Sequence, residues 1–185
     1  MNYNNKGFNQ LTSRRSRYLL DLLQQYDSII YTDIDTIWRK DPRPYFTGSF
    51  DFWAQIGGLF DGSPHLDGYL PIVCTGFLAL QSTPKTKELL NNWYSEMLKY
   101  PDRQDQDVFQ YVVYQSDVDF RVLPIKYFPC GREYFELMSN DLREQVVLIH
   151  NNMIVGKYAK IQRFKEFDLW FKWLPKSKRP RVVSV

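Results

Sequence analysis

The chain has 185 residues, of which 44% are hydrophobic and 17% aromatic, and its formal net charge is +3. This length and composition suffice for one domain with a sizeable core, and the small charge gives no reason to expect nucleic-acid binding. We also expect no membrane segment, because no apolar run is long enough to cross a bilayer and no signal-peptide core is present. The two cysteines, Cys74 and Cys130, could form one bridge or remain two buried thiols.

The first predicted elements are a helix and a strand that lead into a pair of acids. Residues Ser13–Tyr26 have apolar side chains at helical spacing, which predicts an amphipathic helix. Its buried stripe is expected to comprise Tyr18, Leu19, Leu22, Leu23 and Tyr26. A strand over Ile29–Thr32 follows, then Asp33 and Asp35, and then the apolar segment Thr36–Trp38.

The next segments predict two more strands. Asp51–Ile56 is typical of a short strand, and residues 57–68 form a loop rich in Gly, Asp and Pro. The apolar stretch Tyr69–Leu80 predicts the second strand, which is interrupted at Thr75 and Gly76. The glycine there indicates a bulge or the close approach of a ligand to the backbone, and a plain kink explains it equally well.

Two helices are predicted after these strands. The first covers Thr83–Tyr100, with Thr83 as its N-cap and Pro84 at its first position. Its buried stripe is expected to comprise Leu89, Leu90, Trp93 and Met97. The second helix covers Gln104–Tyr114 and opens on acidic residues.

The last third of the chain predicts strands at Val118–Leu123 and Val146–Ile149 and a terminal helix at Arg163–Phe171. One side of that helix is expected to carry Phe164, Phe167 and Trp170. Residues 172–185 form a basic tail. Strands that alternate with helices indicate an α/β fold whose sheet is mostly parallel or mixed.

Asp33 and Asp35 carry the clearest chemical signal. In an extended segment, residues two apart point to the same side, so both carboxylates would face one point while Ile34 turns to the core. Like charges that close repel each other unless a cation lies between them. Carboxylate oxygens suit Mg²⁺ or Mn²⁺, although two surface acids on a solvated turn would give the same pattern.

His150 ends its predicted strand as Asp33 ends its own, so it is a candidate third metal ligand. Gly156 and Lys157, a few residues later, offer a backbone N–H and an ammonium group to a phosphate. A hydrogen-bonded structural histidine is the alternative interpretation of His150.

Asp105, Gln106 and Asp107 cluster where a helix is predicted to begin. Helix capping and the helix dipole explain one or two of the acids. An amide between two carboxylates also offers the mixed donors and acceptors that sugar hydroxyls need.

Four segments, taken in order, resemble a known family: YTDIDTIW, VCTGFLAL, DQDVFQYVV and HNNMIVGKYAKIQRF. Together they look like the nucleotide-diphospho-sugar transferase family, in particular its plant xylosyltransferase-like group, glycosyltransferase family 77. The resemblance extends more distantly to the retaining galactosyltransferases of family 8, and it covers about residues 11–171. It implies an α/β fold of the GT-A type, a Rossmann-like mixed sheet flanked by helices, in a single domain over residues 1–171. We expect that domain to be incomplete at its N-terminus, without the first βαβ portion.

The resemblance also implies roles for particular residues. Asp33, Asp35 and His150 would hold Mn²⁺ (or Mg²⁺), and through it Asp33 would bind the diphosphate of a UDP-sugar. The basic residue before the family's Asp-x-Asp motif matches Arg14 or, better, Arg15. The remaining matches are Gly156 and Lys157 at the phosphates, Asp105 and Gln106 as catalytic residues near the sugar, and Thr75 and Gly76 on the acceptor side.

The activity that the resemblance implies is transfer of a xylose-, galactose- or arabinose-like sugar to a hydroxyl of a glycan or glycoprotein, with retention of configuration. The Golgi lumen is the implied location, although the chain carries no anchor of its own. One alternative is an inactive, truncated remnant that binds sugar or protein. Another is a Mg²⁺-dependent phosphohydrolase, which would need a nucleophilic Asp or a further acid cluster near the metal.

Overall fold

One strand, β4 (Val73–Gln81), runs through the middle of the molecule with both faces covered. In the computed structural model, which describes residues 7, 11–57 and 71–170, every residue of β4 except the last is buried. Leu78 and Leu80 face a core shared with three helices, whereas Phe77 and Ala79 face a second, aromatic-rich core. This explains why β4 is an almost continuous apolar run without alternation.

The sheet has the order β1-β4-β3-β5, and β1 (Ser28–Thr32) and β3 (Phe52–Ile56) both run antiparallel to β4. The fourth strand, β5 (Phe120–Val122), pairs in parallel with β3. The predicted mixed sheet is confirmed, but among the described strands its parallel part is this single pair. A separate antiparallel ribbon joins β2 (Thr36–Trp38) to β6 (Leu148–His150).

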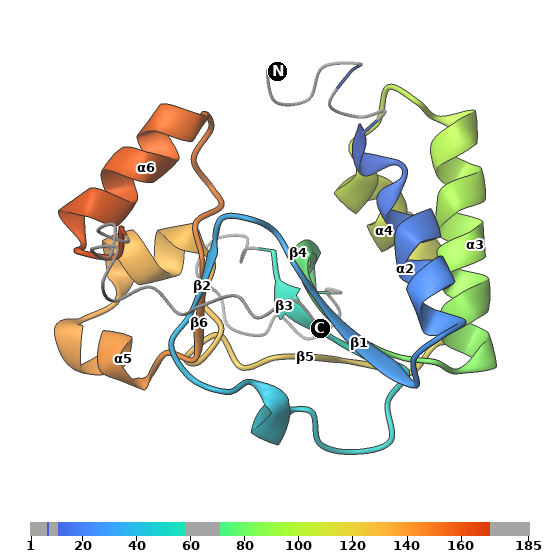
Figure 1. Cartoon of the computed structure of the whole chain (residues 1–185), viewed down its shortest axis with the longest axis horizontal. Helices are drawn as coiled ribbons and strands as arrows, with labels where there is room; N and C mark the ends of the chain where they lie inside the picture. Colours follow the sequence, from blue (N-terminus) through green and yellow to red (C-terminus); the bar gives the residue numbers. More distant parts are fainter. Residues whose placement is uncertain (1–6, 8–10, 58–70, 171–185) are drawn as a thin grey trace, which may run out of the picture.

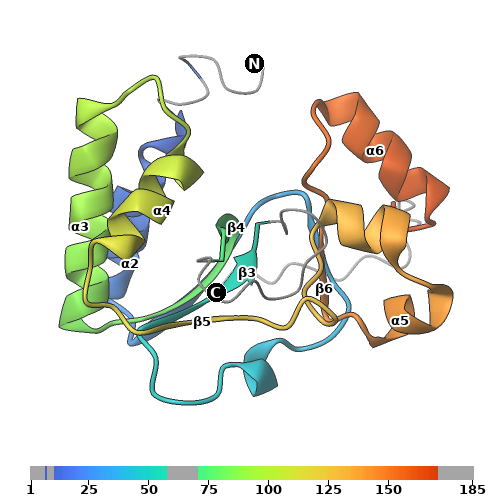
Figure 2. The same cartoon turned by 180° about the vertical axis from the view of Figure 1, so that it is seen from behind.

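The helices form two groups on either side of the strands (Figures 1 and 2). One group contains α2 (Arg15–Leu23), α3 (Pro84–Lys99) and α4 (Asp105–Tyr114). The other, beside the β2–β6 ribbon, contains α5 (Asn140–Gln145) and α6 (Lys157–Glu166). The sequence patterns did not predict α5, the 3-10 turn Arg43–Tyr45 or the π-helical turn Glu133–Leu137.

Helix α3 confirms its prediction closely. The Thr83 hydroxyl accepts a hydrogen bond from the backbone N–H of Thr86 at 3.1 Å, and Pro84 occupies the first helical position. The predicted apolar stripe is buried, with no member more than 1% exposed: Leu89, Leu90, Trp93 and Met97.

Helix α2 turns a different face to the core than the one predicted. Tyr18, Leu22 and Tyr26 are exposed, so the prediction was wrong for these three residues. The buried residues follow the i, i+3, i+4, i+7 spacing of one helical face: Ser16, Leu19, Leu20 and Leu23. Small Ser16 is part of this face where α2 packs against its neighbours.

The C-terminal helix lies earlier in the chain than predicted. It begins after Gly156, whose φ of 100° is readily available only to glycine, and it ends before Asp168, which has a φ of 53°. The prediction of a helix over residues 163–171 was therefore wrong in its bounds. The consequence for the site is that Lys157 and Lys160 belong to the first turns of α6.

Some predictions fall on residues that the structure does not describe: most of the loop at 57–68, Phe171 and the basic tail at 172–185. Within the described part, no helix combines the length and apolar character needed to cross a membrane. Cys74 and Cys130 are both buried as unbridged thiols, which decides between the two alternatives left open by the sequence.

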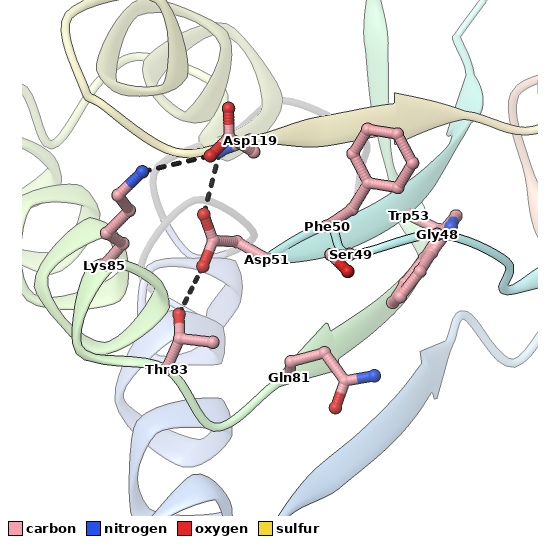
Figure 3. A pocket seen from close by; sticks show the side chains of 9 residues that line it. All are labelled: Gly48, Ser49, Phe50, Asp51, Trp53, Gln81, Thr83, Lys85 and Asp119. Atoms are coloured by element: carbon pink, nitrogen blue, oxygen red, sulfur yellow. Dashed lines mark hydrogen bonds and ion pairs between the residues drawn. The ribbon is translucent and has the colours of Figure 1, made fainter.

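At the end of β4 away from Thr75 and Gly76, a buried carboxylate ties three elements together (Figure 3). Asp51 accepts hydrogen bonds from the Thr83 hydroxyl at 2.5 Å and from the backbone N–H of Asp119 at 2.8 Å. Its own carbonyl accepts from Thr86. Asp51 therefore links the beginnings of β3 and α3 to the segment that enters β5.

We predict that Asp51→Ala lowers the free energy of unfolding by about 1–3 kcal/mol, because two partly buried donors lose a charged acceptor. Urea denaturation followed by circular dichroism measures this loss. Asp119→Ala is the matched control: it removes an exposed carboxylate but keeps the backbone N–H that Asp51 uses. Equal losses in the two variants would contradict the assignment.

Candidate active site

A cleft of about 810 Å³ opens between the two helix groups. Its lining includes Arg15 of α2 and Asp105 of α4 on one flank and Lys160 of α6 on the other. Asp33 and Asp35 lie between these flanks, on the connection from β1 to β2. The cleft therefore gathers residues that lie more than one hundred positions apart in the chain.

The connection between β1 and β2 is a turn rather than an extended segment. Residues Ile34 and Asp35 form this turn, and Ile34 is fully exposed, so the prediction that Ile34 packs in the core was wrong. The physical reason is the change of direction between β1 and β2, which belong to different sheets. Both carboxylates nevertheless approach the same imidazole.

The three residues predicted as metal ligands converge. The Nε2 atom of His150 lies 3.8 Å from Oδ2 of Asp33 and 3.5 Å from Oδ1 of Asp35. One ligand atom from each residue falls within 4.8 Å of the other two. In an octahedral Mg²⁺ or Mn²⁺ site with bonds of about 2.1 Å, ligand atoms lie roughly 3–4 Å apart. The side chains present therefore fit a divalent cation.

Each carboxylate is held through one oxygen and turns the other toward His150. Oδ1 of Asp33 accepts hydrogen bonds from the Tyr31 hydroxyl at 2.7 Å and from Arg15 at 3.3 Å. Oδ2 of Asp35 forms a close ion pair with Lys160. Because the outer oxygens are occupied, the two inner oxygens and the imidazole Nε2 are aimed at one point.

Protonation at this cluster follows from its charges. Burial would raise the pKa of Asp35, but hydrogen bonds and charge from His150 and Lys160 lower it to about 2. Burial likewise opposes a charged His150, yet its neighbours Cys74 and Asp35 raise its pKa to about 10. The opposite shifts of these two pKa values follow in part from the close approach of the Asp35 carboxylate to the His150 imidazole.

Arg15 is enclosed between two acids. Its guanidinium group lies 3.2 Å from Oδ2 of Asp105 and donates to the carbonyl of Thr75 at 2.9 Å. Burial raises the pKa of Asp105 and is opposed chiefly by Arg15. The Oδ2 atom of Asp105 is buried without a hydrogen-bond partner. An acceptor that is ion-paired but makes no hydrogen bond is suited to a ligand hydroxyl.

Gly76 is where the backbone of β4 comes closest to the cluster. A Cβ atom at this position would lie 2.1 Å from Cε1 of His150 and 2.9 Å from Oδ2 of Asp33. The backbone N–H of Asp33 also donates to the Gly76 carbonyl at 2.8 Å. The glycine is therefore required by the close approach of the His150 imidazole, which is a side chain and not a ligand. The register of β4 against β3 also shifts here, between Cys74 and Leu78, as the bulge alternative predicts.

The remaining predicted residues differ in their relation to the cleft. Thr75 and Gln106 both line it and are joined, since the Thr75 N–H donates to the Gln106 amide oxygen at 3.3 Å. Lys157 lines it from an exposed position, with its ammonium group over the ring of Tyr158. Gly156 is exposed and does not belong to the lining residues.

Three residues near the cluster were missed by the sequence analysis: Tyr31, Gln55 and Lys160. Tyr31 had a signal, because it precedes Asp33 by two residues and shares its side of the strand. The sequence signal for Gln55 was weaker: it is an amide within a predicted strand of mostly apolar residues, and the structure buries it. The role of Lys160 could not be recognised from the sequence, because the helix was predicted to begin at Arg163, whereas α6 begins at Lys157.

A family model described as nucleotide-diphospho-sugar transferase matches residues 1–164. The chain belongs to the nucleotide-diphospho-sugar transferase family. This confirms the resemblance found in the sequence. Among its relatives, UDP-D-xylose:L-fucose alpha-1,3-D-xylosyltransferase 3 of Arabidopsis thaliana is 31% identical over 91% of this chain and 49% of its own length. The UDP-galactose:fucoside alpha-3-galactosyltransferase of Dictyostelium discoideum is 24% identical over 91% of this chain and 29% of its own.

Solved structures agree on the fold of this family member. A glycosyltransferase involved in the glycosylation of the major capsid of PBCV-1 matches with a TM-score of 0.60 and 11% identity, over 88% of this chain and 77% of its own. The galactosyltransferase LgtC matches with a TM-score of 0.50 and 18% identity, over 85% of this chain and 67% of its own. The predicted GT-A type of fold is thereby confirmed. The chain spans about half the length of the Arabidopsis relatives that it matches.

Proposed function

We propose that the protein is a glycosyltransferase that takes a sugar from a UDP-sugar and transfers it to a hydroxyl group of a glycan or glycoprotein. The observation that carries this proposal is the convergence of Asp33, Asp35 and His150 beside a cleft lined by further charged groups. Family membership supports it, and so do the UDP-sugars in the names of the relatives. The presence of all three ligands favours an enzyme over a sugar- or protein-binding remnant.

Asp33, Asp35 and His150 would hold Mn²⁺, or Mg²⁺, in this proposal. The ion, when bound, would neutralise negative charge on the diphosphate leaving group. Lys160 lies next to Asp35 and Lys157 one turn earlier in α6, so both ammonium groups are placed to contact the same phosphates. Gly156, at the exposed start of α6, would offer backbone rather than side-chain contacts.

On the opposite flank, Asp105, Gln106 and Arg15 would receive the donor sugar. The Oδ2 atom of Asp105, which is ion-paired with Arg15 but makes no hydrogen bond, would accept one from a sugar hydroxyl. Arg15 keeps Asp33 and Asp105 oriented, and Gln106 together with Thr75 forms the wall next to Gly76, where we place the acceptor. Gln106 is a positioning group in this scheme and not a nucleophile.

The reaction that these groups support is substitution at the anomeric carbon with retention. The bond from this carbon to the UDP oxygen breaks, and UDP leaves with the electron pair. The acceptor hydroxyl forms the new bond on the same face, and its proton passes to the departing phosphate oxygen. Fixed charges on the chain stabilise the leaving group without reorganisation at the moment of reaction.

The sugar we propose is xylose-, galactose- or arabinose-like, and fucosides are the acceptors to test first because the relatives' names contain them. We place the protein in the Golgi lumen by analogy with the family. Incubation with the three UDP-sugars and a fucoside, with the product's anomeric configuration read by NMR, tests donor and stereochemistry together. A product of inverted configuration would contradict the retaining mechanism.

The metal site is tested by calorimetry of UDP binding with and without Mn²⁺. Asp33→Ala and Asp35→Ala should each abolish the Mn²⁺-dependent part of the affinity, because each removes one of three converging ligands. Asp107→Ala is the control, since Asp107 is an exposed acid of the neighbouring acidic cluster. Mn²⁺-dependent UDP binding that persists in both Asp33→Ala and Asp35→Ala would contradict the proposal.

Gly76→Ala should weaken Mn²⁺ binding by at least about tenfold, because the new methyl group would displace the His150 imidazole or the Asp33 carboxylate. Calorimetry with Mn²⁺ alone measures the loss, and near-ultraviolet circular dichroism checks that the variant is folded. A folded variant that binds Mn²⁺ normally would show that the imidazole is not a ligand.

Lys160→Met should have opposite effects on two affinities. Mn²⁺ alone should bind more tightly, because the Lys160 ammonium group no longer competes with it for Asp35. UDP in the presence of Mn²⁺ should bind about tenfold more weakly, because the charge-assisted contact between Lys160 and the phosphates is lost. Lys157→Met, which removes an ammonium group that makes no ion pair with Asp35, should change only the second affinity. Weaker Mn²⁺ binding in Lys160→Met would mean that Lys160 only orients the carboxylate.

A further inference from the structure

The side chain of Gln55 is a polar group in a place where packing alone would favour an apolar one. It is 0% exposed, on a strand whose three preceding residues, Phe52, Trp53 and Ala54, all belong to hydrophobic cores. The pairing of β3 with β4 shifts register between Ala54 and Gln55, which brings Gln55 opposite Cys74. Burying an amide at such a position is costly unless all its hydrogen bonds are made.

The orientation of the Gln55 amide is determined by its donors. Its Nε2 group donates to two backbone carbonyls, of Phe128 at 3.1 Å and of Pro129 at 2.6 Å. Because both N–H groups are directed there, the amide oxygen faces the other way. It lies 2.9 Å from Nδ1 of His150.

This contact determines the role of each imidazole nitrogen. An amide oxygen only accepts hydrogen bonds, so Nδ1 of His150 must be the donor and must carry a hydrogen. In the neutral ring, Nε2 is then the nitrogen with a lone pair, and Nε2 is the atom that faces Asp33 and Asp35. Cys74 also approaches Nδ1, but at 3.6 Å its sulfur is a weaker partner. The opposite tautomer would direct an N–H at the cation position and could not ligate.

We infer that Gln55 is a positioning residue that holds the His150 ring in the tautomer and orientation required for a divalent cation. The inference rests on the proposed function, because it assigns Gln55 a purpose only if the cluster binds a metal. Residues that accept a hydrogen bond from the second nitrogen of a ligating histidine typically change metal affinity 10- to 100-fold when they are replaced.

The test compares two variants, of which only one keeps an acceptor for the Nδ1–H of His150. Gln55→Leu removes the acceptor for Nδ1–H, whereas Gln55→Glu keeps an oxygen there, and both lose donors to the Phe128 and Pro129 carbonyls. Gln55→Leu should bind Mn²⁺ about 10- to 100-fold more weakly in calorimetry. Gln55→Glu should recover most of that loss. The result that would overturn the inference is Mn²⁺ affinity in Gln55→Leu equal to that of the unsubstituted chain.

Gln110→Leu supplies the matched control for stability. Gln110 also bonds to backbone groups through both ends of its amide, donating to Pro71 and accepting from Val73, but makes no contact with His150. It should lower the urea midpoint without changing Mn²⁺ affinity. A purely structural role for Gln55 would instead make Mn²⁺ affinity follow the unfolding free energy across all three variants.

A spectroscopic measurement decides the tautomer directly, even if Gln55→Leu does not fold. The chain has two histidines, so His65→Gln leaves His150 as the single imidazole. In this background, ¹⁵N NMR with Zn²⁺ as a diamagnetic probe should show a protonated Nδ1 and a metal-bound Nε2. The reverse assignment would overturn the inference alone. Failure of the unsubstituted chain to bind Mn²⁺ or Zn²⁺ would instead overturn the proposed metal site, and the inference with it.

Discussion

Two carboxylates that face one point repel each other unless positive charge is supplied, and the arrangement of the cleft satisfies that constraint. The guanidinium group of Arg15, on α2, forms an ion pair with Asp33. The ammonium group of Lys160, on α6, forms one with Asp35. These helices belong to different groups on either side of the strands (Figure 1). The two ion pairs therefore hold the opposite flanks of the cleft to the same short turn.

The third member of the cluster is placed by strand pairing. His150 ends β6 opposite Thr36, the residue after Asp35, and the backbone N–H of Asn151 donates to the Asp35 carbonyl at 2.9 Å. Asn151 in turn donates from its side chain to the carbonyl of Lys160, which attaches α6 to the end of the same ribbon. The end of this ribbon thus brings Asp35 and His150 together, and its bond to α6 places Lys160 against Asp35. Ordinary backbone hydrogen bonds therefore position the side chains that converge here.

The two ends of β4 have different tasks. Near the start of β4, the absence of a side chain at Gly76 allows the His150 imidazole and the Asp33 carboxylate to approach the backbone. Beyond its other end, Asp51 and Thr83 join the strands to α3 by buried hydrogen bonds (Figure 3). Between them, apolar residues on both faces bind β4 to two cores. Apolar packing and the Asp51 hydrogen bonds stabilise β4 at a distance from the cluster. The cluster itself can therefore consist of charged and polar side chains.

Local sequence patterns determined a large part of this protein. The cap and stripe of α3 and the strand before the acidic pair depend on neighbouring residues. Four motifs taken in order resembled the family, and the prediction that Asp33, Asp35 and His150 lie close together is confirmed. The tertiary structure alone decided which face of α2 is buried, that Ile34 is exposed, and that Lys160 pairs with Asp35 across 125 positions. Gln55 shows the reason most clearly, because its role comes from contacts with His150 and with two carbonyls more than seventy residues away. Periodicity and capping act within a few residues of the chain, whereas the partner of a buried polar group depends on how distant segments pack.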